Sequence, residues 1–253
     1  MSSLMRALLA ASILVAAVPS AALAAAEVAP ILTTADSVDD QSYARPREAR
    51  VTHVDLDLEA DFVARAMKGK ATLDVLAQPT ATTVVLDALN LSVSRVTDDK
   101  GRDLPWTMGP GDGDKGAPLT VTLSGARRIV VHYQSGKDAL ALQWLPAELT
   151  AGKTRPFLYS QGQAILNRSW IPTQDSPGVR QTWTARIVVP EGMTAVMSGE
   201  RLTPGGEAAG DGKRAFRFRM THPTAPYLIA IAAGDIAFRA LGPTTGVYTE
   251  PAM

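Results

Sequence analysis

The sequence predicts an all-β protein, a saddle-shaped antiparallel β-sandwich domain preceded by a cleaved N-terminal signal helix. In several segments apolar and polar residues alternate with a period of two, as in strands with one buried and one wet face. Outside the N-terminal segment, no long stretch has a convincing helical period. The 17 prolines and 20 glycines suit the many turns that short strands require.

The N-terminal segment has the features of a secretory signal. Arg6 precedes an apolar run from about Ala7 to Val18, and small residues end it at Ala22–Ala24. The run is shorter than the roughly 20 residues that span a bilayer. We therefore expect cleavage of residues 1–24, export to the periplasm or the medium, and no membrane attachment afterwards.

Residues 25–45 are polar and aperiodic, which predicts a linker or a loosely docked, flexible N-terminal arm. The predicted β-sandwich then covers residues 46–241. Its first strand has Val54, Leu56, Leu58, Ala60 and Phe62 in alternation with Asp55, Asp57, Glu59 and Asp61.

The same alternation recurs in residues 119–123, 183–189 and 216–220. These segments are expected to be strands of antiparallel sheets. The shorter apolar runs "TVVLDAL", "RRIVVHY" and "PYLIAIAAG" are consistent with strands buried on both faces. Only "LPAEL" hints at a helical turn.

Composition excludes several classes of function. The 253 residues are 46% apolar and carry 25 basic and 25 acidic side chains, so no basic field would attract nucleic acid. Cysteine is absent, which excludes disulfides and a lipoprotein anchor. We expect no nucleic-acid partner.

The residues give no catalytic or metal-binding motif. The acidic row at residues 55–61 could bind Ca²⁺, but alternating carboxylates on a strand point into water, so a solvated face is favoured. Asp112 and Asp114 occupy two places of a calcium loop whose other acids are missing, which favours a hairpin turn. The sequence lacks G-x-S-x-G and H-E-x-x-H, and its three histidines are widely separated. Asn167 opens a glycosylation sequon that we interpret as a chance match.

One polar, turn-rich segment, "YSQGQAILNRSWIPTQDSPGVR", interrupts the strands. From the residues alone, Gln161 and Gln163 are interpreted as satisfying backbone groups in a buried bend. Arg168 and Asp175 would pair locally and the two prolines would fix the turn.

The motifs "S-Q-x-Q-A-I", "P-x-Q-D-x-P-x-V" and "T-x-T-A-x-I-x-V-P" occur in this order from Ser160 to Pro190. In this order they resemble the N-terminal domain of the gluzincin aminopeptidases, the zinc aminopeptidase family that includes leukotriene hydrolase and aminopeptidase N. The leukotriene-hydrolase branch is nearest, and the resemblance covers about Val51 to Pro251.

The resemblance implies a substrate-binding role for the loop of Gln161, Gly162, Gln163 and Ala164, which would hold the N-terminal end of a peptide. Gln163 stands where the aminopeptidase N branch has a Glu that binds the free α-amine. A Gln amide can donate and accept, but the ammonium would need an acid from elsewhere. Gly162 would let the backbone approach the ligand. No catalytic and no metal-binding residue is expected in this chain.

The resemblance also implies Zn²⁺ for the full-length enzyme, held by an H-E-x-x-H motif in a catalytic domain that this sequence lacks. Residues 242–253 would be the start of that domain. The first hypothesis is therefore the recognition domain of an exported zinc metallo-aminopeptidase, truncated before the zinc site and inactive alone. The second is a free-standing periplasmic peptide-binding module. The first predicts an exposed apolar patch near residues 227–233 or at the C-terminal edge.

Overall fold

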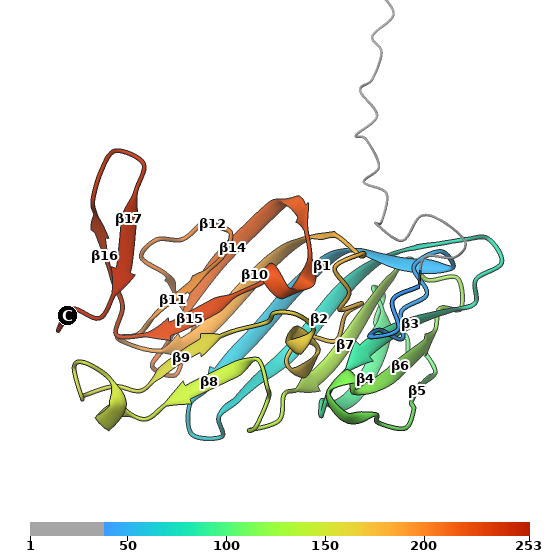
Figure 1. The fold of residues 1–253 in the computed structure, drawn as a ribbon, viewed down its shortest axis with the longest axis horizontal. Helices are drawn as coiled ribbons and strands as arrows, with labels where there is room; N and C mark the ends of the chain where they lie inside the picture. Colours follow the sequence, from blue (N-terminus) through green and yellow to red (C-terminus); the bar gives the residue numbers. More distant parts are fainter. Residues whose placement is uncertain (1–37) are drawn as a thin grey trace, which may run out of the picture.

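The computed structural model describes residues 38–253, so the expected signal peptide and residues 25–37 lie outside the described residues. The described part consists of strands and single-turn 3₁₀ helices, which confirms the all-β prediction (Figure 1). The hint at "LPAEL" corresponds to one such turn, η2 (Ala147–Leu149). Among the described residues, no helix is long and apolar enough to cross a membrane.

The largest sheet has eight strands in the order β12-β14-β10-β1-β2-β7-β4, with β13 also paired to β14. Its neighbours are antiparallel except for one pair, because β10 runs parallel to β1. The expectation of purely antiparallel sheets is corrected at this pair. The strand bounds are β1 Ala49–Asp61, β2 Ala66–Ala77, β4 Ser92–Asp98, β7 Arg128–Gln134, β10 Gln181–Pro190, β12 Glu200–Arg201, β13 Glu207–Ala208 and β14 Lys213–Thr224.

Three smaller sheets complete the described fold. One has the order β11-β15-β9-β8, another the order β3-β6-β5, and β16 and β17 form a separate hairpin that stands away from the body (Figure 1). Their bounds are β3 Thr83–Ala88, β5 Trp106–Met108, β6 Ala117–Thr122, β8 Leu142–Leu145, β9 Phe157–Ser160, β11 Thr194–Met197, β15 Ile231–Gly234, β16 Ala237–Ala240 and β17 Gly246–Thr249.

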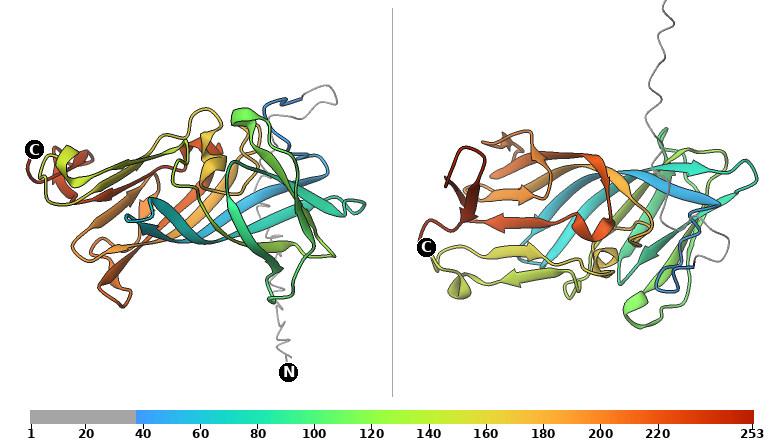
Figure 2. Two further views of the ribbon diagram at one scale, coloured as in Figure 1. Left: turned by 90° about the horizontal axis from the view of Figure 1, so that it is seen from below. Right: turned by 45° about the horizontal axis from the view of Figure 1, so that its top comes forward.

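The core lies between the large twisted sheet and two of the smaller sheets, β11-β15-β9-β8 and β3-β6-β5, which cover one of its faces (Figure 2). The apolar residues that alternate along β1 point into this core, and so do those of β6, β10 and β14. Leu158 of β9 and Leu86 of β3 belong to the same cluster of buried side chains. The period of two therefore places the buried face as expected. β7 differs from the expectation, because its burial alternates and its second face is not covered.

The acidic residues of β1 lie on the outer face, where Asp57, Glu59 and Asp61 are paired with cations. Asp57 Oδ1 accepts a hydrogen bond from Arg186 Nη1 at 2.9 Å, and Glu59 Oε2 accepts one from Lys213 Nζ at 3.1 Å. These cations come from β10, which lies next to β1 in the sheet, and from β14, which lies beyond β10, although both strands are far from β1 in sequence. The acidic row of β1 is therefore an ion-paired surface. The other calcium candidate, the loop at Asp112, is part of a hairpin between β5 and β6.

Candidate functional site

The loop of Gln161–Ala164 connects β9 to η3 (Leu166–Ser169), a turn that lies between the two smaller sheets and contacts β3 on one side and η4 (Pro226–Leu228) on the other. Gln161, Gln163 and Ala164 are exposed, whereas Gly162 is buried. The backbone N–H of Gln161 donates to the backbone carbonyl of Ala141 at 2.8 Å. The Gln161 side chain accepts from the backbone N–H of Gln163 at 2.9 Å.

The two glutamines therefore differ in what they can offer a ligand. Gln161 uses its side-chain oxygen inside the loop. Among the described residues, none forms a hydrogen bond with the Gln163 side chain, which is exposed. The bend is thus not buried at its glutamines, in contrast to the interpretation from the residues alone. The peptide bond between Gln163 and Ala164 is cis.

Gly162 is required by packing within the protein. A Cβ built on Gly162 would overlap the side-chain oxygen of Asn167 and the carbonyl oxygen of Tyr227. The sequence predicts that Gly162 lets the backbone come close to a ligand. The structure adds a second reason for glycine here, because no side chain would fit between the loop and Asn167.

Beneath the loop, η3 and the following turn form a buried polar layer that extends from Asn167 to Ser176. Its centre is Arg168, whose side chain is fully buried. The guanidinium lies 3.4 Å from Asp175 Oδ2 and 3.8 Å from Asp87 Oδ2, and it also donates to the carbonyls of Gln41 and Lys115 at 2.8 and 2.7 Å. Arg168 and Asp175 do pair, as the sequence suggests.

This Asp87–Arg168–Asp175 cluster, called the buried cluster below, holds two carboxyls and one cation. Burial raises the pKa of Asp175 to about 6, although the guanidinium opposes the shift. Burial likewise raises the pKa of Asp87, again against the attraction of Arg168. Because two acids share one cation in a dry site, the cluster binds a proton more readily than a free aspartate does.

The buried cluster also fastens the described end of the N-terminal arm. Ser42 Oγ donates to Asp87 Oδ2 at 2.6 Å, and the backbone N–H of Tyr43 donates to Asp87 Oδ1 at 2.7 Å. Ser176 Oγ bonds to Asp39. Residues 39–43 are thus docked on the fold through hydrogen bonds that are buried or partly buried.

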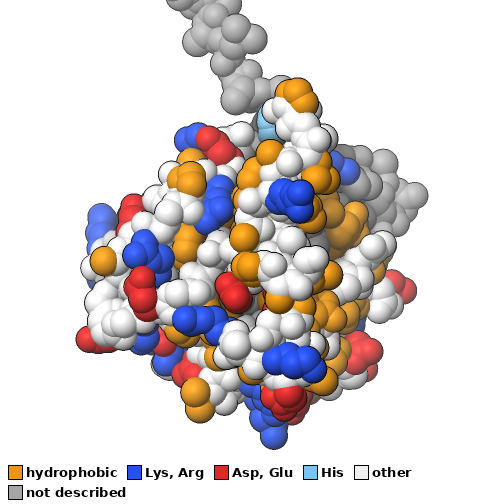
Figure 3. All heavy atoms as spheres, turned by 90° about the vertical axis from the view of Figure 1, so that its left-hand side faces the viewer, with side chains coloured by type: hydrophobic (Ala, Val, Ile, Leu, Met, Phe, Trp, Pro, Cys, Tyr) orange, Lys and Arg blue, Asp and Glu red, His pale blue; other side chains and the backbone are white. Residues whose placement is uncertain are grey.

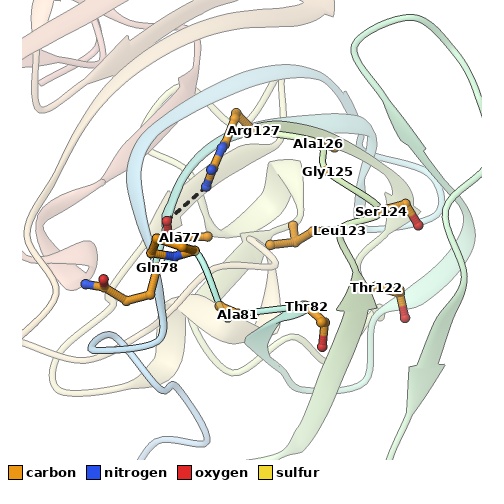
Figure 4. A pocket seen from close by; sticks show the side chains of 11 residues that line it. Ala77, Gln78, Ala81, Thr82, Thr122, Leu123, Ser124, Gly125, Ala126 and Arg127 are labelled. Atoms are coloured by element: carbon orange, nitrogen blue, oxygen red, sulfur yellow. Dashed lines mark hydrogen bonds between the residues drawn. The ribbon is translucent and has the colours of Figure 1, made fainter.

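The surface cavities described lie away from the loop of Gln161–Ala164. One of about 360 Å³ lies at the ends of β2, β3, β6 and β7 (Figure 4). Arg127 closes one side of it and donates to the carbonyl of Ala77 at 2.9 Å. Apart from Gln78, its other lining residues are small, apolar or hydroxyl-bearing, so the cavity offers no acid and no nucleophile paired with a base.

Within residues 38–253, no group of three or more His, Cys, Asp or Glu side chains is arranged to hold a metal ion. His53 lies on the outer face, with Nδ1 2.7 Å from Thr182 Oγ1. Partial burial lowers the pKa of His53. The described residues therefore do not fit a zinc site, and we derive no hydrolytic step from them.

The C-terminal end carries exposed apolar side chains, as the sequence predicts for this edge. Phe238 and Tyr248 pack against each other across the β16–β17 hairpin, with ring centroids 4.9 Å apart, and both are about half exposed. Leu241 and Val247 are also exposed. Figure 3, which views this end of the molecule, shows apolar side chains among scattered charges of both signs.

Residues 50–228 match the family model described as the Peptidase M1 N-terminal domain. The chain belongs to this family. It is 34% identical over 219 residues to leukotriene A-4 hydrolase of Xenopus laevis, in an alignment that covers 84% of this chain and 36% of the relative. It is 35% identical over 247 residues to aminopeptidase B of Mus musculus, which covers 88% of this chain and 37% of the relative.

Solved structures agree with this membership. A yeast leukotriene A4 hydrolase in complex with bestatin superimposes with a TM-score of 0.77 at 29% identity, over 87% of this chain and 34% of that one. A zinc metallopeptidase of the same family from Deinococcus radiodurans, at 24% identity and a TM-score of 0.61 over 80% of this chain and 47% of that one, shares the fold. The M1 N-terminal domain described here thus spans about a third of the curated relatives' length.

The motifs found in the sequence identify the exposed loop but not what holds it. In the sequence Asn167 stands out only as part of a sequon, whereas the structure places it at 0% exposure beneath Gly162. Two of its hydrogen-bond partners, Pro226 and Ile229, lie in and directly after η4, about 60 residues further along the chain. No local pattern signals such a contact.

Proposed function

We propose that this chain is the substrate-recognition domain of an exported zinc metallo-aminopeptidase, and that the loop of Gln161–Ala164 contacts the N-terminal end of a peptide. The observation that carries the proposal is the Gln163 amide, which is exposed on a loop with buried supports and has no hydrogen bond from the described residues. Family membership and the motif "S-Q-x-Q-A-I" support it.

The chemistry of Gln163 suits a peptide terminus. A primary amide donates through nitrogen and accepts through oxygen, so it can meet the ammonium and the first carbonyl of a peptide. It carries no charge, and the ammonium would then be neutralised by an acid of another domain. Recognition and catalysis are separate in this proposal: Zn²⁺ and its ligands belong to a catalytic domain that packs on the C-terminal end.

Binding can be tested on the chain itself by recording the side-chain amide signals of Gln163 by NMR during titration with the tripeptide Ala-Ala-Ala. We expect shifts with the free tripeptide and much smaller ones with its N-acetyl form, because acetylation removes the ammonium. Gln163→Ala should abolish the shifts of neighbouring backbone amides. Gln134→Ala, which changes another exposed glutamine on β7, should leave them intact. Equal shifts with both peptides would overturn recognition of a free N-terminus.

Catalysis is tested separately. The chain with added Zn²⁺ should not hydrolyse an amino-acid p-nitroanilide, and chelator-sensitive turnover would contradict the proposal. Sequencing the gene beyond codon 253 should reveal a frame with G-x-M-E-N and H-E-x-x-H. A stop codon there would favour the free-standing peptide-binding module instead.

A further inference from the structure

One buried amide side chain, that of Asn167, packs directly beneath the exposed loop of Gln161–Ala164. Asn167 is fully buried in η3, and its Nδ2 donates to the carbonyl of Pro226 at 2.6 Å and to that of Ile229 at 2.9 Å. Its Oδ1 accepts the indole N–H of Trp170 at 2.9 Å. Both N–H donors and the oxygen of the amide are therefore used inside the protein.

These hydrogen bonds join two segments that are distant in sequence. Pro226 is the first residue of η4 and Ile229 directly follows its last, so Asn167 connects η3 to η4. Gly162 lies directly against the Asn167 oxygen, and no Cβ would fit between them. The carbonyl of Gly162 accepts from the amide of Leu166 at 2.9 Å, which closes the loop over this contact. The position of the Asn167 amide therefore sets the position of Gly162, which lies between the two glutamines.

We propose that Asn167 is the positioning residue of the loop of Gln161–Ala164, fixing where the Gln163 amide meets a peptide N-terminus. The part of this inference that concerns peptide rests on the proposed function. The part that concerns loop geometry does not, so the two can fail separately. Asn167 does not itself touch the ligand, because it is buried beneath Gly162.

The substitution Asn167→Asp tests the proposal with little change of shape. Aspartate keeps an acceptor for the Trp170 indole, but it has no N–H to give and would direct an oxygen at two carbonyl oxygens. A buried donor–acceptor pair is thus replaced by repulsion between two acceptors. We expect η3 and η4 to separate locally and Gly162 to move with them.

Gln174→Glu is a matched control. Gln174 is also fully buried, donates from Nε2 to the carbonyls of Ala49 and Val85 at 2.9 and 3.2 Å, and accepts the amide of Val51 at 2.9 Å. The amide-to-acid change therefore removes the same set of hydrogen bonds. Its partners belong to β1 and β3, not to the loop of Gln161–Ala164.

Two measurements on both variants decide the matter. Hydrogen exchange of the Leu166 amide should be about tenfold faster in Asn167→Asp than in Gln174→Glu at equal global stability, because local opening controls it. The shifts that Ala-Ala-Ala induces in Gln163 should be lost only in Asn167→Asp. Asn167→Ser, which removes the hydrogen bonds without adding charge, replaces the aspartate if that variant does not fold.

The outcomes distinguish the positioning of the loop by Asn167 from the recognition of a peptide by that loop. Equal exchange in the two variants would overturn the positioning role, whatever the peptide does. Faster exchange with unchanged peptide-induced shifts would confirm that Asn167 positions the loop, and would overturn the assignment of peptide recognition to that loop.

Discussion

The buried cluster predicts an unusual pH dependence of stability, which the substitution Asp175→Asn should remove. Asp175 is 1% exposed, and burial raises its pKa to about 6 from an ordinary value of 3.8. The folded protein therefore binds a proton at this carboxyl in a range where the unfolded chain does not. The free energy of unfolding must then rise as the pH falls through about 6.

The size of the effect follows from the same pKa. Between pH 7 and pH 5 a group with a folded pKa of about 6 takes up most of one proton, whereas an unfolded aspartate stays ionised. This difference amounts to roughly 1 kcal/mol of added stability at pH 5. Asp87 acts in the same direction, because burial raises its pKa as well. The profile therefore belongs to the cluster as a whole.

Urea unfolding followed by tryptophan fluorescence at pH 5 and pH 7 measures this difference. Asp175→Asn leaves Arg168 with Asp87 as its one acidic partner and gives the cluster no net charge, so the gain at pH 5 should be much smaller in the variant. Comparing the two proteins cancels His53, whose lowered pKa acts in the opposite direction. Identical pH dependence in wild type and Asp175→Asn would refute the reasoning.

Three further predictions concern other features. Gly162→Ala should lower the free energy of unfolding by roughly 1–3 kcal/mol in urea unfolding, because the new Cβ overlaps backbone and the Asn167 side chain, whereas Gly205→Ala, with open space around it, should change it little. Ser42→Ala removes the bond to the buried Asp87 carboxylate, so limited proteolysis should cleave the arm faster; an unchanged rate would show that other contacts hold the arm. Asp57→Asn should cost less than about 1 kcal/mol, because its ion pair is partly exposed, and a larger loss on unfolding would contradict this.

Local sequence patterns were sufficient for the class of fold and for the buried faces of the alternating strands, though not for β7. Alternation along β1 predicts correctly that Val54 and Leu58 are buried, since side chains on a strand point to opposite faces. The motif around Gln163 marks the loop, and the structure places Gln163 at the surface. Because these features depend on neighbouring residues in sequence, one sequence was enough to predict them.

Tertiary structure alone decided which segments meet. The parallel pairing of β1 with β10, the cations opposite the acidic row and the anchoring of Asn167 to η4 all join residues far apart in sequence. Arg168 gathers Gln41, Asp87, Lys115 and Asp175 from four separate segments. Local periodicity carries no information about partners at such distances. The sequence by itself therefore determined an all-β family domain with a polar loop, and packing around two buried side chains, Asn167 and Arg168, decided how that loop and the arm are held.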